Sequence, residues 1–199
     1  VSQSMREKGL DYKVNFGIEL PRLKEIASKF EKNHDVAQAL WKENIRECKI
    51  VAGLLQPVDT FYPDIADIWV EDMRYPEIAE LTVMNLFQHL PYASEKAFEW
   101  IAREEPYFQF CGYMLVARLL MKYGELNERA ENELLDQVVP ALSGESGFVF
   151  RAASTALRKY ASQSKENARK VRGVLISLPS SERPEVLSLL EETKILTES

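Results

Sequence analysis

The sequence has little that would support cofactor, metal or nucleophilic chemistry. It contains eight glycines but no glycine-rich phosphate loop, and it lacks both a nucleophile elbow and a His-Glu-x-x-His pattern. Its two histidines are His34, in a polar stretch, and His89, late in an apolar one. We therefore expect no metal site and no cofactor, and the spacing of these residues does not favour a Ser/His/acid triad.

Long hydrophobic runs and paired cysteines are also lacking. No run approaches the ~18 apolar residues that a bilayer-spanning helix needs, and Val1–Leu10 lacks the apolar core of a secretory signal. Cys48 and Cys111 are far apart and each lies in an apolar window, so we expect buried free thiols in a reducing compartment. The sequence thus predicts a cytoplasmic monomer that does not contact a membrane.

The charge is acidic overall but unevenly distributed. A net charge of −6 argues against a general polyanion binder, whose affinity comes from neutralising phosphates. Residues Asp59–Glu80 hold seven acids and one base, whereas Arg151–Arg172 hold seven bases and one acid. The basic C-terminal stretch is either an interaction surface or the solvated faces of surface helices.

What the sequence does contain is a regular series of amphipathic helix pairs. They restart about every 30 to 37 residues, near Asp35, Pro63, Ser94, Asn127 and Ser164, which is typical of a helical solenoid. The apolar spacing and the Pro, Gly and cap residues predict eleven helices. Their expected ranges are Leu20–Phe30, Asp35–Lys42 (N-cap Asp35), Ile45–Leu55, Pro63–Val70, Pro76–Leu90, Ser94–Ala102, Pro106–Tyr123, Asn127–Leu142 (broken late by Pro140), Phe148–Ala161, Ser164–Leu178 and Pro184–Leu196. We expect an all-α superhelix of about five helix pairs forming one domain over residues 1–199, with truncation of its N-terminal part left open.

Five segments resemble the DNA alkylation repair family, the AlkD-type glycosylases built from HEAT-like repeats. Asn15–Leu23 resembles the family's Gly-Val-x-x-Pro-x-Leu/Arg entry, and Ala39–Leu55 resembles its Ala-Leu-Trp-x-x-x-Ile-x-Glu-x-Arg/Lys helix. The similarity continues at Trp69–Asp72, Met84–Phe87 and Phe148–Arg158, in order, along nearly the whole chain. The resemblance implies HEAT-like repeats and a basic channel that holds DNA and excises cationic N3- or N7-alkylated purines.

The residues that the resemblance assigns to catalysis are replaced here. The family's Trp-Asp-x-x-Asp motif falls on Pro76–Glu80, so Pro76 stands for the first Trp and Glu80 for the catalytic Asp. The second Trp falls on Thr155, and the family's Arg pair falls on Gln109 and Phe110. Glu80 could act as the catalytic carboxylate, although a misplacement of about 1 Å can cost ~100-fold in rate. It can also be read as a first-turn acid favoured by the helix dipole.

The residues predicted to bind DNA therefore differ from those that would catalyse base excision, and three hypotheses remain. The chain is a DNA-binding relative with weak or lost base excision, an active alkylpurine glycosylase that uses Glu80, or a helical-repeat scaffold for a protein partner. In the first case the DNA is a duplex or an unusual structure. Arg151 and Arg158 share a helix face with Thr155, at i−4 and i+3. The full set of candidate DNA-binding residues is Arg46, Lys49, Arg151, Arg158, Lys159, Lys165, Arg169 and Arg172.

Overall fold

The computed structural model describes residues 15–179 and 182–198, and every regular element in these ranges is a helix. The α-helices are α2 (Leu20–Ala27), α3 (His34–Lys42), α4 (Arg46–Leu55), α5 (Pro63–Glu71), α6 (Pro76–Asn85), α7 (Ala93–Ile101), α8 (Pro106–Tyr123), α9 (Glu128–Ser143), α10 (Gly147–Ala161), α11 (Lys165–Ser177) and α12 (Pro184–Glu198). The 3-10 helix η1 (Phe87–His89) follows α6. All eleven predicted helices are present, and the predicted start of each pair agrees to within one residue.

Four local predictions were wrong, and one of them is the end of the first helix, which lies at Ala27 instead of Phe30. Asn33, not Asp35, caps α3, because its side chain accepts a hydrogen bond from the Val36 N–H at 3.0 Å. The helix beginning at Pro76 ends at Asn85 instead of Leu90, because Leu86 leaves the helical region with φ −129° and ψ −62°. Pro140 does not break α9, which continues to Ser143; Pro140 is exposed, so water can reach the carbonyl that its missing N–H leaves unbonded.

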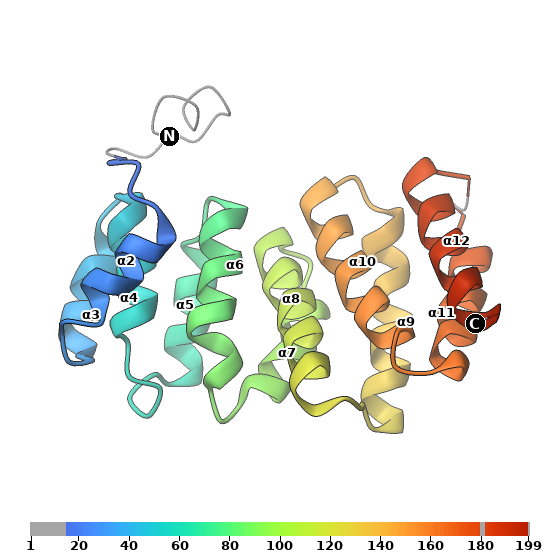
Figure 1. The fold of residues 1–199 in the computed structure, drawn as a ribbon, viewed down its shortest axis with the longest axis horizontal. Helices are drawn as coiled ribbons and strands as arrows, with labels where there is room; N and C mark the ends of the chain where they lie inside the picture. Colours follow the sequence, from blue (N-terminus) through green and yellow to red (C-terminus); the bar gives the residue numbers. More distant parts are fainter. Residues whose placement is uncertain (1–14, 180–181, 199) are drawn as a thin grey trace. The chain divides into compact units, whose positions relative to one another are not determined.

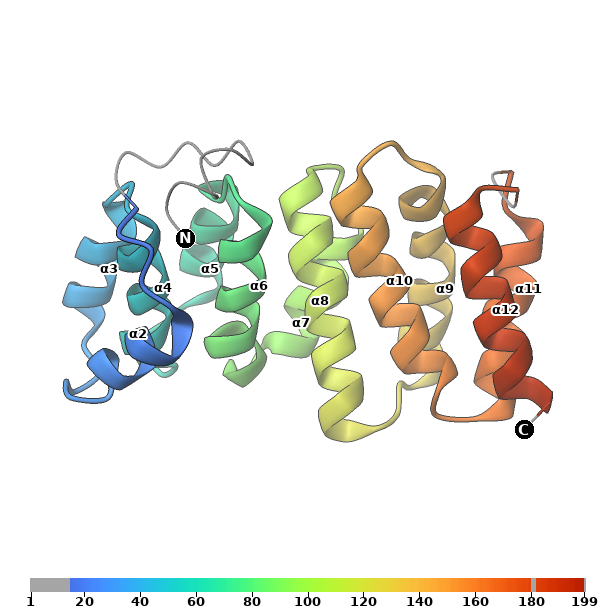
Figure 2. The same ribbon diagram turned by 45° about the horizontal axis from the view of Figure 1, so that its top comes forward.

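The helices divide into two compact units, Val1–Ala93 and Ser94–Ser199. The expectation of one domain over residues 1–199 stays a prediction. In unit 1, α4 packs against α2, α3 and α6 (Figure 2). The core of this unit includes Trp41 and Trp69, whose rings stack with centroids 3.9 Å apart and planes 4° apart. Phe61 meets Trp69 edge to face.

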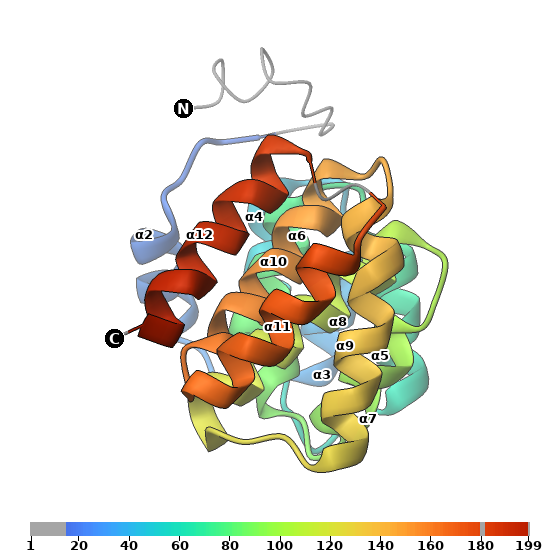
Figure 3. The ribbon, with the colours of Figure 1, turned by 90° about the vertical axis from the view of Figure 1, so that its right-hand side faces the viewer.

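Unit 2 is organised as two layers of helices. Figures 1 and 3 show α8, α10 and α12 in one layer and α7, α9 and α11 in the other. Most of α8 is buried because its apolar residues cover nearly its whole circumference, and it packs closely on α10. Gly124 ends α8 with φ +81°, and its N–H bonds the Leu120 carbonyl oxygen at 2.9 Å. The result is a side-by-side arrangement of α8, α10 and α12, and the candidate site lies on α10, α11 and α12.

Two further predictions concern membrane-spanning helices and the two cysteines. Within residues 15–179 and 182–198, no helix combines the length and the apolar character needed to cross a bilayer. Both cysteines are free, as predicted; Cys111 is buried, but Cys48 is only half-buried.

Candidate nucleic-acid interface

The exposed face of α10 carries Thr155, which the sequence resemblance predicts to stand in place of a tryptophan. Residues of α10 such as Val149, Ala153 and Leu157 are buried, whereas Arg151 and Arg158 are exposed. This division follows from the helical spacing of apolar and charged residues. Thr155 is half-buried between the two arginines, and its hydroxyl donates to the Arg151 carbonyl oxygen at 2.8 Å. Its polar group is therefore used within the helix, and Thr155 offers no aromatic face for a base.

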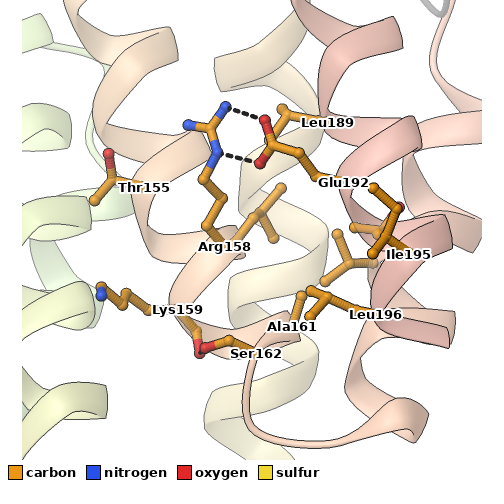
Figure 4. Close-up of a pocket in the computed structure, with 12 residues that line it drawn as sticks. Thr155, Arg158, Lys159, Ala161, Ser162, Leu189, Glu192, Ile195 and Leu196 are labelled. Atoms are coloured by element: carbon orange, nitrogen blue, oxygen red, sulfur yellow. Dashed lines mark hydrogen bonds and ion pairs between the residues drawn. The ribbon is translucent and has the colours of Figure 1, made fainter. Parts of the chain in front are cut away.

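Arg158 is held by a carboxylate on the neighbouring helix. Its Nε lies 2.6 Å from Glu192 Oε2 and its Nη2 lies 3.1 Å from Glu192 Oε1. Figure 4 shows this pair bridging α10 and α12. The side chains are 46% and 42% exposed, so solvent screens the pair. The hydrogen bonds from Arg158 lower the pKa of the Glu192 carboxyl group below its ordinary value, so Glu192 is ionised at neutral pH.

A groove runs between α10 and α12, and its two ends differ in chemistry. Near the starts of both helices it opens into a cavity of about 600 Å³ that is lined by charged and polar residues. Toward the helix ends lies a second, mainly apolar cavity of about 480 Å³, drawn in Figure 4. Arg158 lines both cavities. The Arg158–Glu192 pair thus marks the boundary between a polar half and an apolar half of the groove.

Besides Arg158, four of the candidate cations are exposed on α10 and α11. They are Arg151, Lys159, Lys165 and Arg169, and we call them the basic surface. Their side chains form no hydrogen bond or ion pair with another residue in the described ranges. Lys159 and Lys165 flank the short turn between the two helices. The basic surface therefore presents positive charge that no internal carboxylate neutralises.

Arg172 lies in a different environment from the basic surface. It is half-buried, and its Nη1 donates to the Leu190 carbonyl oxygen on α12 at 3.0 Å. This contact ties α11 to α12.

Arg46 and Lys49 are buried in unit 1, with 4% and 8% of their surface exposed. Arg46 makes two hydrogen bonds to Glu77, at 2.9 and 2.6 Å. Lys49 Nζ lies 2.8 Å from both the Trp41 carbonyl oxygen and Asp72 Oδ2. Their donors are thus occupied by internal partners, and we do not include them in the proposed interface.

Glu80 and Pro76 both lie on α6 in unit 1. Pro76 is the first helical residue, and Glu77 is the acid of the first turn. The first-turn interpretation of Glu80 was therefore wrong, since Glu80 lies one turn further on. Glu80 is exposed, and its carboxylate makes no hydrogen bond or ion pair with any described residue. Nothing in the described part of unit 1 holds this carboxylate in a fixed position.

Gln109 and Phe110, where the Arg pair was expected, lie in the first turns of α8. Gln109 donates from Nε2 to the Arg103 carbonyl oxygen at 2.7 Å. Phe110 is 6% exposed and packs against Phe148, with ring centroids 5.6 Å apart. One side chain closes a local turn and the other fills the core, so neither supplies a positive charge.

The tryptophans cannot replace the missing aromatic faces. Trp41, Trp69 and Trp100 are all buried, with at most 4% of their surface exposed. Each packs against another aromatic ring. The described residues also contain no cluster of three or more His, Cys, Asp or Glu side chains that could hold a metal ion.

Sequence reasoning missed Arg183, which lines the polar cavity of the groove. Its Nη1 donates to the carbonyl oxygens of Leu142 and Gly144, at 3.1 and 3.2 Å. Its guanidinium carbon lies 5.2 Å from the Phe150 ring centroid. The sequence feature that could have identified Arg183 is its position directly before Pro184, the first residue of α12. A cation at that position lies near the start of the groove.

Comparison with known proteins adds a family and a fold. A sequence model of the family described as DNA alkylation repair enzyme matches residues 2–172, so α12 lies beyond the match. A solved structure with a TM-score of 0.74 covers 85% of this chain and 76% of its own, at 17% identity. It is described as belonging to a new family of proteins related to the HEAT-like repeat DNA glycosylases with affinity for branched DNA structures. No curated protein matches the chain. The fold is thus an all-α solenoid of HEAT-like repeats, as predicted.

Proposed function

This chain belongs to the family of DNA alkylation repair enzymes, and from that premise we propose that it binds DNA through the basic surface and has weak or no base-excision activity. One observation carries the proposal. Arg151, Lys159, Lys165 and Arg169 are exposed on α10 and α11, and their side chains form no ion pair with another described residue. Phosphate contacts by such cations supply most of the sequence-independent affinity for DNA.

The loss of excision activity is inferred from the residues that replace the family's catalytic set. A cationic alkylated base is a good leaving group, so the remaining task is to stabilise the positive charge that develops on the sugar. Pro76 and Thr155 provide no aromatic face, and Gln109 and Phe110 provide no guanidinium group. Glu80 alone would have to act without the fixed dipoles that make such sites effective.

The form of DNA is part of the proposal. The structural relative is described by its affinity for branched DNA, and this chain shares its fold at low sequence identity. We therefore propose that binding does not require an alkylated base. A four-way junction and a linear duplex of equal length are the two substrates that test this point.

Charge reversal tests the binding proposal. We expect a variant with Arg151→Glu, Lys159→Glu, Lys165→Glu and Arg169→Glu to give no retardation of either DNA at low salt in a mobility-shift assay. The reason is that four favourable phosphate contacts become repulsive, and each contact changes the slope of log affinity against log salt by about 0.9.

The matched control reverses four exposed cations of unit 1, Arg22, Lys24, Lys29 and Lys32, which changes the net charge by the same amount. Retardation that survives in the first variant, or is lost equally in both, contradicts the assignment of the basic surface. Far-UV circular dichroism checks that both variants are folded.

A helical-repeat scaffold for a protein partner is the second candidate, and the surface of α5 favours it. Tyr62, just before this helix, and Ile68 within it are 64% and 60% exposed, and they lie among the acidic residues Asp64, Glu71 and Asp72. Exposed apolar groups with a polar rim are typical of protein contact sites. If this candidate is correct, Ile68→Lys weakens partner binding and the charge reversal of the basic surface does not.

A further inference from the structure

The polar cavity between α10 and α12 is lined by three arginines. Arg151 and Arg158 come from α10, and Arg183 precedes α12. Gly147 and Pro184, the first residues of the two helices, also line it, so both positive helix ends lie at this cavity. Glu185 is the acid in its wall, and Glu192 faces Arg158 from outside it. The arginines outnumber these carboxylates, so the cavity has an excess of positive charge.

The three arginines differ in how freely they can bind a ligand. Arg183 is fixed by the carbonyl oxygens of Leu142 and Gly144, which do not neutralise its charge. The side chain of Arg151 has no partner in the described ranges. Arg158 is bound to a carboxylate, Glu192, through two parallel hydrogen bonds. Arg183 is therefore fixed, Arg151 is available to a ligand, and Arg158 is paired with a carboxylate.

A hydroxyl group in the same wall adds a second, independent feature. Ser154 lines the cavity and is 2% exposed, and its Oγ has no hydrogen-bond partner among the described residues. It lies three residues after Arg151 and four before Arg158, on the same face of α10. Buried hydroxyl groups almost always have a partner in folded proteins, so an unpaired one in a cationic wall suggests a ligand.

We propose that this cavity is a phosphate-binding subsite, in which Arg158 exchanges the Glu192 carboxylate for a DNA phosphate group held inside the cavity. This inference rests on the proposed function, because it assigns one phosphate contact of the bound DNA. Arg158 already presents the two-point geometry that guanidinium groups use for both carboxylates and phosphates. Arg151 supplies a second charge, and the Ser154 hydroxyl can donate to a phosphate oxygen.

The exchange is feasible because the existing pair is weakly held. Both side chains are more than two-fifths exposed, and pairs in such positions gain little from their attraction. A phosphate group carries a similar negative charge and accepts the same two hydrogen bonds. Glu192 therefore acts as an internal competitor that lowers the affinity of the subsite for DNA.

Removing the competitor is the direct test. We expect Glu192→Gln to bind a linear duplex about fivefold more tightly in a fluorescence anisotropy titration, with an unchanged salt slope, because the wild type already makes the same phosphate contact. Glu191→Gln is the matched control, because it removes the same charge from the adjacent exposed residue, whose nearest cation is Lys194 at 3.9 Å. Equal gains for both variants would mean that only net charge matters, and would overturn the proposal.

A double-mutant cycle shows whether the gain passes through Arg158. In an Arg158→Ala background, Glu192→Gln should no longer improve binding, since the cation that it releases is absent. A gain of the same size in that background would also overturn the proposal. Duplexes with and without 5′-phosphates separate the two sources: a gain confined to the phosphorylated duplex assigns a terminal phosphate, and an equal gain assigns a backbone phosphate.

A titration without DNA separates this inference from the proposed function. Inorganic phosphate is added to the full chain, and the arginine Nε–H signals are followed by nuclear magnetic resonance. We expect saturable shifts of the Arg151 and Arg158 signals, enhanced in Glu192→Gln and not in Glu191→Gln. If no DNA is bound but these shifts occur, the proposed function fails and the subsite stands. If DNA is bound through the basic surface but these shifts are absent, the subsite fails alone.

Discussion

Arg46 joins three segments of unit 1 through a single guanidinium group. It bonds Glu77 at the start of α6, the Ile18 carbonyl oxygen before α2, and its neighbour Glu47. Glu47 in turn accepts the N–H groups of Phe16 and Ile18, each at 3.2 Å. The partners of Arg46 thus satisfy its charge and most of its donors inside the protein. At this position a basic residue stabilises the fold and is not available to a ligand.

Removing this guanidinium should lower stability and leave DNA binding unchanged. We expect Arg46→Ala to reduce the free energy of unfolding by about 3 kcal/mol, because it leaves the Glu47 and Glu77 carboxylates without their buried partner. Arg22→Ala is the control, since Arg22 pairs with Glu25 on the exposed surface and such pairs contribute at most about 1 kcal/mol. Urea unfolding of the full chain measures both effects.

Anisotropy with duplex DNA completes this comparison. If Arg46→Ala unfolds like the wild type but binds DNA more weakly, Arg46 contacts DNA after all and the structural role is contradicted.

At the scale of single residues, the sequence predicted which residues are basic but not which of them are available. Arg46 and Arg151 both lie on amphipathic helices within segments that resemble the same family. They differ in their partners, because Arg46 bonds Glu77, which is 31 positions away in the sequence, whereas the side chain of Arg151 has no partner in the described ranges. Arg158 is also paired with a distant residue, Glu192, which is 34 positions away. Such pairs depend on which helix faces meet, and the spacing of residues within one helix carries no information about that.

At the scale of elements, α7 and α8 approach each other closely at Gly112. A Cβ atom at this position would lie 2.7 Å from both the backbone N and the Cγ2 of Ile101, and 2.9 Å from the Ala97 carbonyl oxygen. Two of these three atoms belong to the backbone of α7, which cannot move aside as a side chain can. The absence of a side chain at Gly112 therefore sets the separation of this helix pair.

Adding one methyl group at this contact should be costly. We expect Gly112→Ala to lower the free energy of unfolding by about 1–3 kcal/mol, as for other overpacked sites. Gly173→Ala in α11 is the matched control, because no heavy atom lies within 4 Å of its added Cβ. This control should stabilise the protein by about 0.5–1 kcal/mol through helix propensity alone.

Thermal and urea unfolding of the two alanine variants decide the point. A Gly112→Ala variant that is as stable as Gly173→Ala would show that α7 and α8 do not pack as described.

Most helix boundaries could be predicted because they are encoded locally. Prolines start α5, α6, α8 and α12 at the positions expected from the sequence, and Gly124 ends α8. The break at Leu86 could not be predicted, because the apolar pattern continues through it to Leu90. That break depends on tertiary packing, since Leu86 and Phe87 are fully buried.

At the scale of the whole molecule, the proposed function assigns binding and base excision to different residues. The basic surface of unit 2 would supply the positive charge for DNA binding, whereas the resemblance predicts that Pro76, Gln109, Phe110 and Thr155 replace the family's catalytic tryptophans and arginines. The resemblance in the sequence predicted these replacements, although only Thr155 falls within one of the five similar segments. It could not show that Thr155 bonds its own helix or that Glu80 has no partner among the described residues.

The most direct test of binding without excision measures base release from DNA that is fully bound. A duplex containing 7-methylguanine is incubated with enough protein to retard all of it in a mobility-shift assay, and the free base released is followed over time. We predict release at the spontaneous rate, equal in the wild type and in Glu80→Gln, because no preorganised group stabilises the charge that develops on the sugar. Release well above the spontaneous rate that is abolished by Glu80→Gln would contradict the account and make this chain an alkylpurine glycosylase.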